Sequence, residues 1–367
     1  MGCALVLGGY GNFGRRVVAD LAGDRDHRVI VAGRDAQKAR AVADEVGALT
    51  EPAAIDGRAA NLAAELRRLG ATIVVHTAGP FQGRDYAVAQ ACIEARAHYV
   101  DLADARAYVC GIGVLDEAAR RNGVLVVSGA SSVPALSSAV VDMLRSQFST
   151  IESIEHGITS GAKPPGLAAM EGVLGYAGKP IAEWRDGAWR TVYGWQDLTR
   201  HSYPRPVGAR WLCNCDVPDL ELFPQRYAPV RTVVFRAGVA MAASMLATWG
   251  ASWLVRAGVL ASLTPHVPWL HSAALAIERF GSKCSAMHVA LRGLDLQSQP
   301  LSRTWWLLAA NNHGPQVPCF PAIALARKLL RGEVDTRGAM PCLGLLTVDE
   351  ILAVGRDLNL WTLQTAA

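Results

Sequence analysis

The sequence predicts an α/β protein, in which a doubly wound parallel sheet is followed by a second domain with a mixed α+β sheet. Three observations lead to this prediction. An apolar run at Cys3–Leu7 passes directly into a turn rich in glycine. Short apolar runs then alternate with helical patterns as far as residue 130, which is typical of parallel strands joined by helical crossovers. Beyond that residue the alternation ends and hairpin-like segments begin.

The opening segment places a strand, a glycine turn and a helix in the order of a Rossmann-type dinucleotide-binding fold. A G-x-G-x-x-G pattern follows the apolar run, and a helical pattern begins at Arg15. The first glycine permits a sharp turn, the second lets the backbone approach a diphosphate, and the third lets the helix pack closely on the strand. Free N–H groups and the helix dipole favour an anion there.

We therefore expect this turn to bind the diphosphate of a dinucleotide. The residues expected to line it are Gly8, Gly9, Tyr10, Gly11, Asn12, Phe13 and Gly14. The alternative is a tight structural turn that binds no ligand.

The remaining elements of the first domain follow from the same alternation. We expect strands at 28–34, 53–56, 71–77, 98–102 and 124–127. We expect helices at 36–46, 59–69, 86–95 and 113–122. Parallel neighbours need such crossovers, so the sheet is expected to be parallel and the first domain to span residues 1–130.

The second domain is expected to span residues 131–330. A helix should run from residue 131 to about Arg145, and strand-like segments follow at 153–159, 189–194, 286–293 and 305–308. Asp186 and Gly187 predict a hairpin turn between two apolar segments. The C-terminal segment 331–367, with a helix at 347–357, is expected to return to the first domain.

The end of the second strand favours NADP over NAD. Arg34 stands about 20 residues after the glycines, where this fold places the residue that discriminates between the two cofactors. A guanidinium can bind a 2′-phosphate in a bidentate, charge-assisted contact worth roughly 1.5–3 kcal/mol. Lys38 adds positive charge one turn later. Asp35 follows Arg34 at once, and it would favour NAD if its carboxylate faced the ribose.

Composition narrows the class of partner. The formal net charge is only +4 and the basic residues are dispersed, so we expect a small-molecule substrate and no nucleic acid. The eight cysteines show no C-x-x-C pair and no zinc-like Cys/His spacing, so no metal is expected. We expect a cytoplasmic protein, because no disulfide framework is evident and Met1–Leu7 lacks the features of a signal peptide.

The stretch from Ala237 to Val255 has no charged residue. Its many alanine, glycine and serine residues give it too little apolar content for a membrane span. At helical spacing the stretch presents a stripe of small residues, which comprises Ala240, Ala243, Ala247 and Ala251. It also presents a stripe of bulkier residues, which comprises Ala242, Leu246, Trp249 and Trp253. We expect a helix at a subunit interface or under an apolar pocket, and the alternative is peripheral contact with a membrane surface. Gly258–Ile277 is also uncharged but is interrupted by two prolines.

Four segments together resemble the saccharopine dehydrogenase-like oxidoreductases: Val6–Gly14, Val31–Arg34, His76–Phe81 and His98–Leu102. The resemblance is strongest over residues 1–145 and extends more thinly to 160–163, 215–219 and 338–342. It implies an NADP-binding domain, a mixed-sheet domain that contacts substrate and forms a homodimer, and hydride transfer to or from a C–N or C–C bond. It does not specify a substrate.

The nicotinamide should meet the turns at the carboxyl ends of the later strands. Ala78, Gly79 and Pro80 are expected under the nicotinamide ribose, with Gly79 permitting close approach. Asp101 and Tyr99 are the expected acid–base residues, and Asp104 is a weaker candidate. The alternatives are that Asp101 caps the following segment and that Tyr99 packs in the sheet.

Lys163 is the other catalytic candidate, because it lies in a loop rich in glycine and proline. It would bind a substrate carboxylate or supply a proton, and the alternative is a solvated surface lysine.

The expected function is therefore an NADP-dependent oxidoreductase acting on a C=N or C=C bond of a small, apolar substrate. The alternative is a nucleotide-binding, non-catalytic protein that associates with lipid or a protein partner through its hydrophobic helix.

Overall fold

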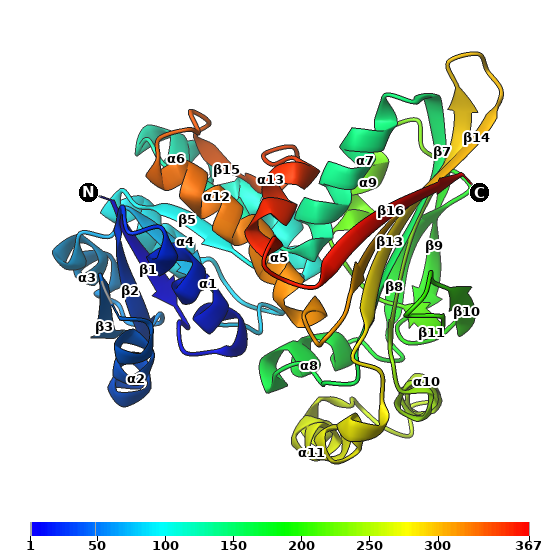
Figure 1. The fold of residues 1–367 in the computed structure, drawn as a ribbon, viewed down its shortest axis with the longest axis horizontal. Helices are drawn as coiled ribbons and strands as arrows, with labels where there is room; N and C mark the ends of the chain where they lie inside the picture. Colours follow the sequence, from blue (N-terminus) through cyan, green and yellow to red (C-terminus); the bar gives the residue numbers. More distant parts are fainter. Residues whose placement is uncertain (1, 48, 367) are drawn as a thin grey trace. The chain divides into compact units, whose positions relative to one another are not determined.

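The computed structural model describes residues 2–47 and 49–366, and its elements are labelled in Figure 1. The chain divides into two compact units. Unit 1 comprises residues 1–136 and 316–354, and unit 2 comprises residues 137–315 and 355–367.

Unit 1 contains a parallel sheet of seven strands in the order β15-β6-β5-β4-β1-β2-β3. The strands are β1 (Cys3–Leu7), β2 (Arg28–Gly33), β3 (Thr50–Ala54), β4 (Ile73–His76), β5 (His98–Asp101), β6 (Leu125–Ser128) and β15 (Gly338–Pro341). The chain order reverses between β1 and β4, which is where doubly wound sheets bind ligands. The predicted Rossmann-type sheet is confirmed.

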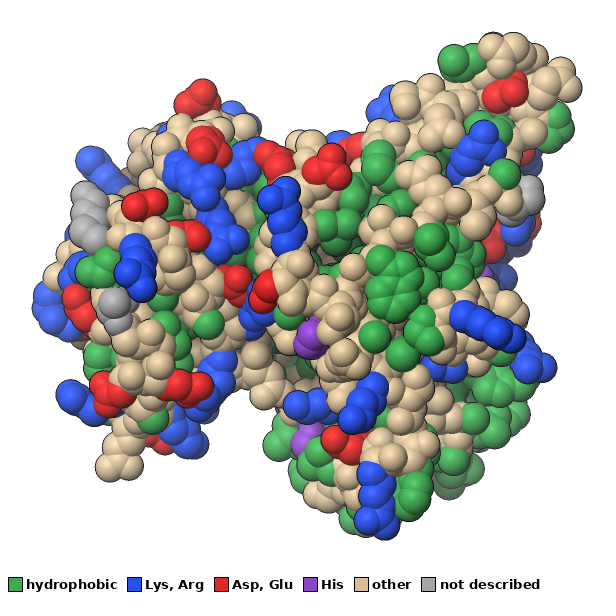
Figure 2. Space-filling model, viewed as in Figure 1, with side chains coloured by type: hydrophobic (Ala, Val, Ile, Leu, Met, Phe, Trp, Pro, Cys, Tyr) green, Lys and Arg blue, Asp and Glu red, His purple; other side chains and the backbone are tan. Residues whose placement is uncertain are grey.

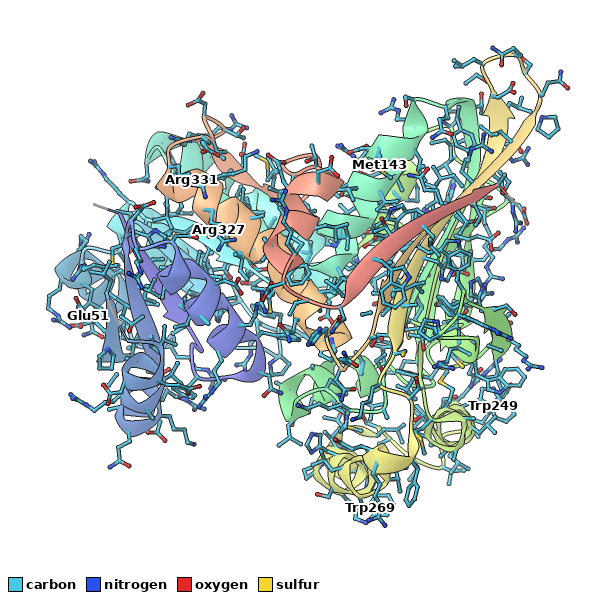
Figure 3. All side chains as sticks on the ribbon, viewed as in Figure 1. Glu51, Met143, Trp249, Trp269, Arg327 and Arg331 are labelled. Atoms are coloured by element: carbon cyan, nitrogen blue, oxygen red, sulfur yellow. The ribbon has the colours of Figure 1, made fainter. Side chains whose placement is uncertain are left out.

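Helices cover both faces of this sheet, because alternate residues of each buried strand point to opposite sides. Leu5, Leu7 and Val74 pack in one core cluster with α3 (Leu62–Leu69) and α4 (Ala87–Ala95). In Figure 1, α1 (Asn12–Gly23) and α12 (Phe320–Leu330) lie in front of the sheet. Arg327 of α12, labelled in Figure 3, joins these two helices, since its Nε donates to Asp24 Oδ2 at 2.8 Å. Helix α2 (Ala36–Val46) follows β2 as predicted.

The helix expected at 113–122 is instead an interrupted segment. It consists of α5 (Arg106–Gly111), a 3₁₀ turn at Ile112–Leu115 and α6 (Asp116–Arg121). Gly111 lets Tyr86 approach this segment closely, because a Cβ there would lie 2.6 Å from the hydroxyl oxygen of Tyr86. The helix predicted at 347–357 is likewise shorter, with α13 at Val348–Leu352 and a 3₁₀ turn after it.

Unit 2 contains a mixed sheet, as predicted, and this sheet has nine strands. Its central strands are β7 (Phe148–Ser160), β12 (Thr232–Val239), β13 (Ser285–Asp295) and β14 (Pro300–Ala309), of which β7 and β12 pair in parallel. The others are β8 (Pro180–Arg185), β9 (Ala188–Tyr193), β10 (Thr199–Ser202), β11 (Ala209–Asn214) and β16 (Leu360–Ala366). The hairpin predicted at Asp186 and Gly187 joins β8 to β9, with φ of 53° and 77° at the two turn residues.

The helices of unit 2 are α7 (Ser137–Arg145), α8 (Leu167–Leu174), α9 (Asp219–Arg226), α10 (Ala242–Arg256) and α11 (Val267–Ile277). The helix expected from Ala237 begins five residues later, because β12 continues to Val239 in register with β7. Neither predicted stripe of this helix is its buried face, since Met245 and Ser252 are its buried residues. Among the described residues, no helix is long and apolar enough to cross a membrane.

The contact between the start of α1 and the end of β1 leaves no room for a side chain. A Cβ added at Gly14 would lie 2.1 Å from the carbonyl oxygen of Gly8 and 2.7 Å from the Cα of Gly9. Both of these atoms belong to the backbone, so the clash cannot be relieved by a rotamer change.

We therefore expect Gly14→Ala to destabilise the protein by about 2 kcal/mol or more, as overpacking of a rigid contact does. Gly23→Ala is the matched control in the same helix, because nothing lies within 4 Å of a Cβ there. It should cause no loss of stability. Chemical denaturation of both variants measures this, and equal effects would contradict the close contact at Gly14.

Candidate active site

The glycine turn is fastened to the second strand. Gly8 has a φ of 85°, a conformation that favours glycine. The amides of Gly8 and Gly9 both donate to the carbonyl of Ala32, at 2.8 and 3.1 Å. The amide of Gly11 donates to the Gly8 carbonyl at 2.8 Å. The turn is therefore held rigidly at the carboxyl ends of β1 and β2.

The first turn of α1 is open to an anion. Gly11 is the N-cap residue and has no side chain, so no side-chain hydrogen bond caps this helix. Asn12 is exposed and Phe13 is half-buried. Uncapped amides at a helix N-terminus are the groups that bind diphosphate in Rossmann-type folds. The residues present thus fit a dinucleotide.

Tyr10 shapes the neighbouring turn between β2 and α2. A Cβ at Gly33 would lie 2.4 Å from the Tyr10 ring, so glycine at this position makes room for the aromatic ring. The hydroxyl of Tyr10 accepts a hydrogen bond from the Asp35 amide at 3.2 Å. The sequence places Tyr10 in the cofactor turn but does not predict this contact with the Asp35 amide.

Arg34 and Asp35 have different surroundings. Asp35 caps α2, because its Oδ1 accepts the amides of Gln37 and Lys38 at 3.0 and 3.1 Å. The hydrogen bond from the Lys38 amide is the largest of the contacts that hold the pKa of Asp35 below its usual value. Arg34 is exposed and makes no hydrogen bond or ion pair to any described residue. The cation is therefore available to a ligand, and the carboxylate is already engaged.

The loop after β4 lies against the glycine turn. The amide and the Oγ1 of Thr77 both donate to the carbonyl of Leu7, at 2.8 and 3.0 Å. Of the residues expected under the nicotinamide ribose, Ala78 is exposed, and Gly79 and Pro80 are partly exposed. Phe81 turns inward and packs edge-on against His76, with ring centroids 5.0 Å apart. The loop thus presents a small, accessible surface beside the strand-order reversal.

Asp101 is buried at the end of β5. Its Oδ1 accepts three hydrogen bonds, from the Gly129 amide at 2.8 Å, the Ala103 amide at 2.9 Å and the Ser128 hydroxyl at 3.0 Å. Burial raises the pKa of Asp101 to about 6, although these three donors favour the carboxylate and oppose the shift. The carboxylate ties the end of β5 to the end of β6, and its contact with the Ala103 amide is the one that it makes with the segment following β5.

Tyr99 lies in a buried chain of hydrogen bonds in the same part of unit 1. Its hydroxyl is 3.0 Å from His76 Nδ1 and 3.1 Å from the hydroxyl of Tyr108. Burial raises the pKa of Tyr99 and lowers that of His76 to about 4, so both groups are neutral at pH 7. Two neutral groups can share this hydrogen bond, in which the Tyr99 hydroxyl donates to an unprotonated Nδ1 of His76 or accepts from its N–H.

His76 is a residue that sequence reasoning treated only as part of a strand. It is the last residue of β4 and so stands next to the loop that begins at Thr77. The signal that would have found it is its position: a titratable side chain at the carboxyl end of a strand beside the strand-order reversal.

The other two candidates differ in their surroundings. Asp104 accepts a hydrogen bond from Gln82 Nε2 at 3.4 Å. Lys163 lies in unit 2, in the loop between β7 and α8, and is exposed. No group of three or more His, Cys, Asp or Glu side chains that could hold a metal occurs within the described ranges.

Comparisons with known proteins agree with this geometry. Residues 4–143 match the family described as the saccharopine dehydrogenase NADP binding domain. The saccharopine dehydrogenase (L-Glu forming) of Saccharomyces cerevisiae has a similar structure, with a TM-score of 0.69 and 14% identity, over 100% of both chains. The homospermidine synthase of Legionella pneumophila, solved with NAD, has a TM-score of 0.62 and 10% identity, over 100% of this chain and 91% of that one. No curated protein matches the sequence.

The buried Asp101 predicts a pH dependence of stability. A folded-state pKa of about 6, against an ordinary value of 3.8, means that the folded protein binds this proton more tightly. The ionised form therefore costs stability, and the cost grows as the pH rises from about 4 to 6, reaching about 3 kcal/mol.

Asp101→Asn removes this titration. We expect the unfolding free energy of the wild type, relative to that of the variant, to fall by up to about 3 kcal/mol between pH 4 and 6.5. Urea unfolding at a series of pH values measures it. A difference between the two proteins that does not change with pH would show that the carboxyl is not held in this way.

Proposed function

We propose that this chain is an NAD(P)-dependent oxidoreductase and that its cofactor is NADP. The match of residues 4–143 to the saccharopine dehydrogenase NADP binding domain supports both parts of the proposal. We further propose that it transfers a hydride to or from a C=N or C=C bond of a small, apolar substrate. The resemblance supports this class of bond, because it implies hydride transfer at a C–N or C–C bond.

The observation that carries the choice of cofactor is the contrast between Arg34 and Asp35. Two backbone amides occupy Asp35 Oδ1, so this carboxylate is turned towards its own helix. Arg34 stands at the end of β2 with its guanidinium unengaged by the described residues. A 2′-phosphate placed there gains a charge-assisted partner and meets no free carboxylate.

The chain's own groups can supply the proton that accompanies the hydride. When bound, the reduced cofactor provides the hydride for the carbon atom, and the nitrogen or second carbon must then receive a proton. The hydroxyl of Tyr99 is hydrogen-bonded to His76, the residue that borders the accessible loop at Ala78. We assign this pair to proton transfer and the Asp101 carboxylate to holding the ends of β5 and β6.

Lys163 is the second candidate proton donor. Its loop contains prolines at 164 and 165 and connects β7 to α8. An exposed ammonium there can bind a substrate carboxylate or donate the proton directly. A homodimer in the cytoplasm completes the proposal, since the resemblance implies dimerisation through the mixed-sheet domain.

For the cofactor, we expect Arg34→Ala to weaken NADPH binding about 10- to 100-fold, the loss of one charge-assisted contact, and to change NADH binding by less than about twofold. Isothermal titration calorimetry with both cofactors measures this. Arg121→Ala is the matched control, because Arg121 is an exposed arginine of unit 1 that pairs with Glu117. Equal losses for NADPH and NADH in the Arg34 variant would refute the assigned role.

For the reaction, NADPH oxidation is followed spectrophotometrically with a panel of imines, α,β-unsaturated carbonyl compounds and keto acids. We expect turnover with an imine or an activated C=C bond, and transfer of deuterium from C4-deuterated NADPH to the product. Tyr99→Phe should lower kcat about 100-fold, as the loss of an acid–base group does, and leave NADPH affinity unchanged.

Two variants serve as controls for this experiment. Tyr227→Phe removes a hydroxyl of unit 2 that donates to the Ser138 carbonyl, and it should leave kcat unchanged. Lys163→Met tests the second candidate proton donor. If this variant lost much of its kcat and the Tyr99 variant lost none, Lys163 would be the proton donor instead of Tyr99. NADPH binding without oxidation of NADPH by any of the compounds would contradict the proposal.

A further inference from the structure

One end of unit 2 is built from apolar helices that the rest of the unit barely covers. This helical end comprises residues 242–283, with α10, α11 and the segments that follow each helix. Figure 1 places α10 and α11 at the same end of unit 2, and Figure 3 labels Trp249 and Trp269 on them. Met245 and Ser252 are the buried residues of α10, and Val267 is the buried residue of α11.

Large apolar side chains project from this end. Val259 and Phe280 are each 70% exposed and Trp269 is 71% exposed. Other large exposed hydrophobic residues here are Leu246, Trp253, Leu254 and Leu275. Single exposed apolar residues are common on proteins, but a set gathered on two neighbouring elements marks an interaction site. The expectation that this helix lies under an apolar pocket does not account for side chains so accessible to solvent.

The charges at the helical end are almost all positive. From residue 237 to residue 277, Arg256 is the only Lys, Arg, Asp or Glu residue, and Arg279 and Lys283 follow with a single acid, Glu278. Two of the cations stand beside exposed aromatic rings. The guanidinium carbon of Arg256 is 5.0 Å from the centre of the Trp253 ring, and that of Arg279 is 4.7 Å from the Phe280 ring. Figure 2 shows Lys and Arg side chains among the hydrophobic ones on this part of unit 2.

We infer that the helical end docks on the surface of an anionic lipid bilayer. Tryptophan and other aromatic side chains favour the depth of the lipid headgroups, where one end of the ring is apolar and the other is wet. Arginine and lysine beside them meet anionic headgroups, each contributing about 1 kcal/mol near such a surface. The helices are 15 and 11 residues long, so they would lie in the interface rather than cross it.

Charge also argues for lipid over a second copy of the chain. A twofold interface brings the same patch of both subunits together. The positive charges of Arg256, Arg279 and Lys283 would then lie close to the same charges of the second subunit, and Glu278 is the only acidic residue of the helical end that could offset them. An anionic bilayer neutralises all three. This inference does not depend on the proposed reaction, because the surface lies outside the dinucleotide-binding residues of unit 1.

Co-sedimentation of the full chain with vesicles tests the inference. We expect binding to vesicles of phosphatidylcholine with phosphatidylglycerol, weaker binding to phosphatidylcholine alone, and a loss of binding as salt is raised. Replacing both Trp269 and Phe280 by serine should weaken binding at least tenfold, because each ring would otherwise be buried among the lipids. Trp189→Ser is the matched control, since Trp189 is an exposed tryptophan of β9 outside the helical end, and it should bind as the wild type does.

Far-ultraviolet circular dichroism and NADPH binding establish that the double variant is folded. Absence of binding to anionic vesicles, or equal binding by the wild type and the double variant, would overturn the inference. So would a wild-type dimer in solution that the double variant converts to a monomer while vesicle binding is absent, since a second copy would then cover this surface.

Discussion

The backbone contact between Gly14 and Gly8 is the constraint on which the candidate site depends. It brings the start of α1 against the end of β1 with no side chain between them. The amides of Gly8 and Gly9 then bond to Ala32 of β2, so the turn, the first strand and the second strand form one rigid group. If a side chain stood between the start of α1 and the end of β1, the helix would lie farther from the sheet. Its uncapped amides would then not be placed at the point where the strand order reverses.

Around this rigid group, competition for hydrogen bonds decides which side chains remain available. Asp35 and Arg34 are neighbours in the sequence, yet the helix N-cap position uses the carboxylate of one and leaves the guanidinium of the other exposed. Asp101 shows the same effect at the other side of the sheet, where two loop amides and a hydroxyl occupy its Oδ1. The groups that remain accessible are thus the small loop at Ala78 and the basic residue at the end of β2.

The sequence predicted those parts of the fold that depend on local pattern. Buried strands such as β1 and β4 are continuous apolar runs, and Asp186 with Gly187 satisfies the geometry of a tight hairpin, so both were predicted correctly. Strands β15 and β16 were not predicted. Each pairs with a strand far away in the chain, β6 and β14, and no local pattern encodes a partner at that distance.

The candidate site was predictable to a similar extent. The glycine turn and Arg34 follow from a spacing that has a direct physical reason, and they occupy the expected ends of strands. The link between Tyr99 and His76 could not be predicted, because it joins two strands through side chains that are 23 positions apart in the sequence. The start of α10 was wrong for a related reason: pairing with β7 extends β12 over residues whose own pattern is helical.

The most direct measurement of the central claim is a crystal structure of the protein with NADP bound. The account predicts that the diphosphate lies at the amides of the first turn of α1 and that the 2′-phosphate lies within hydrogen-bonding distance of the Arg34 guanidinium. Asp35 should still cap α2 in that complex. A dinucleotide bound elsewhere, or one whose ribose is held by the Asp35 carboxylate while Arg34 remains in solvent, would contradict it.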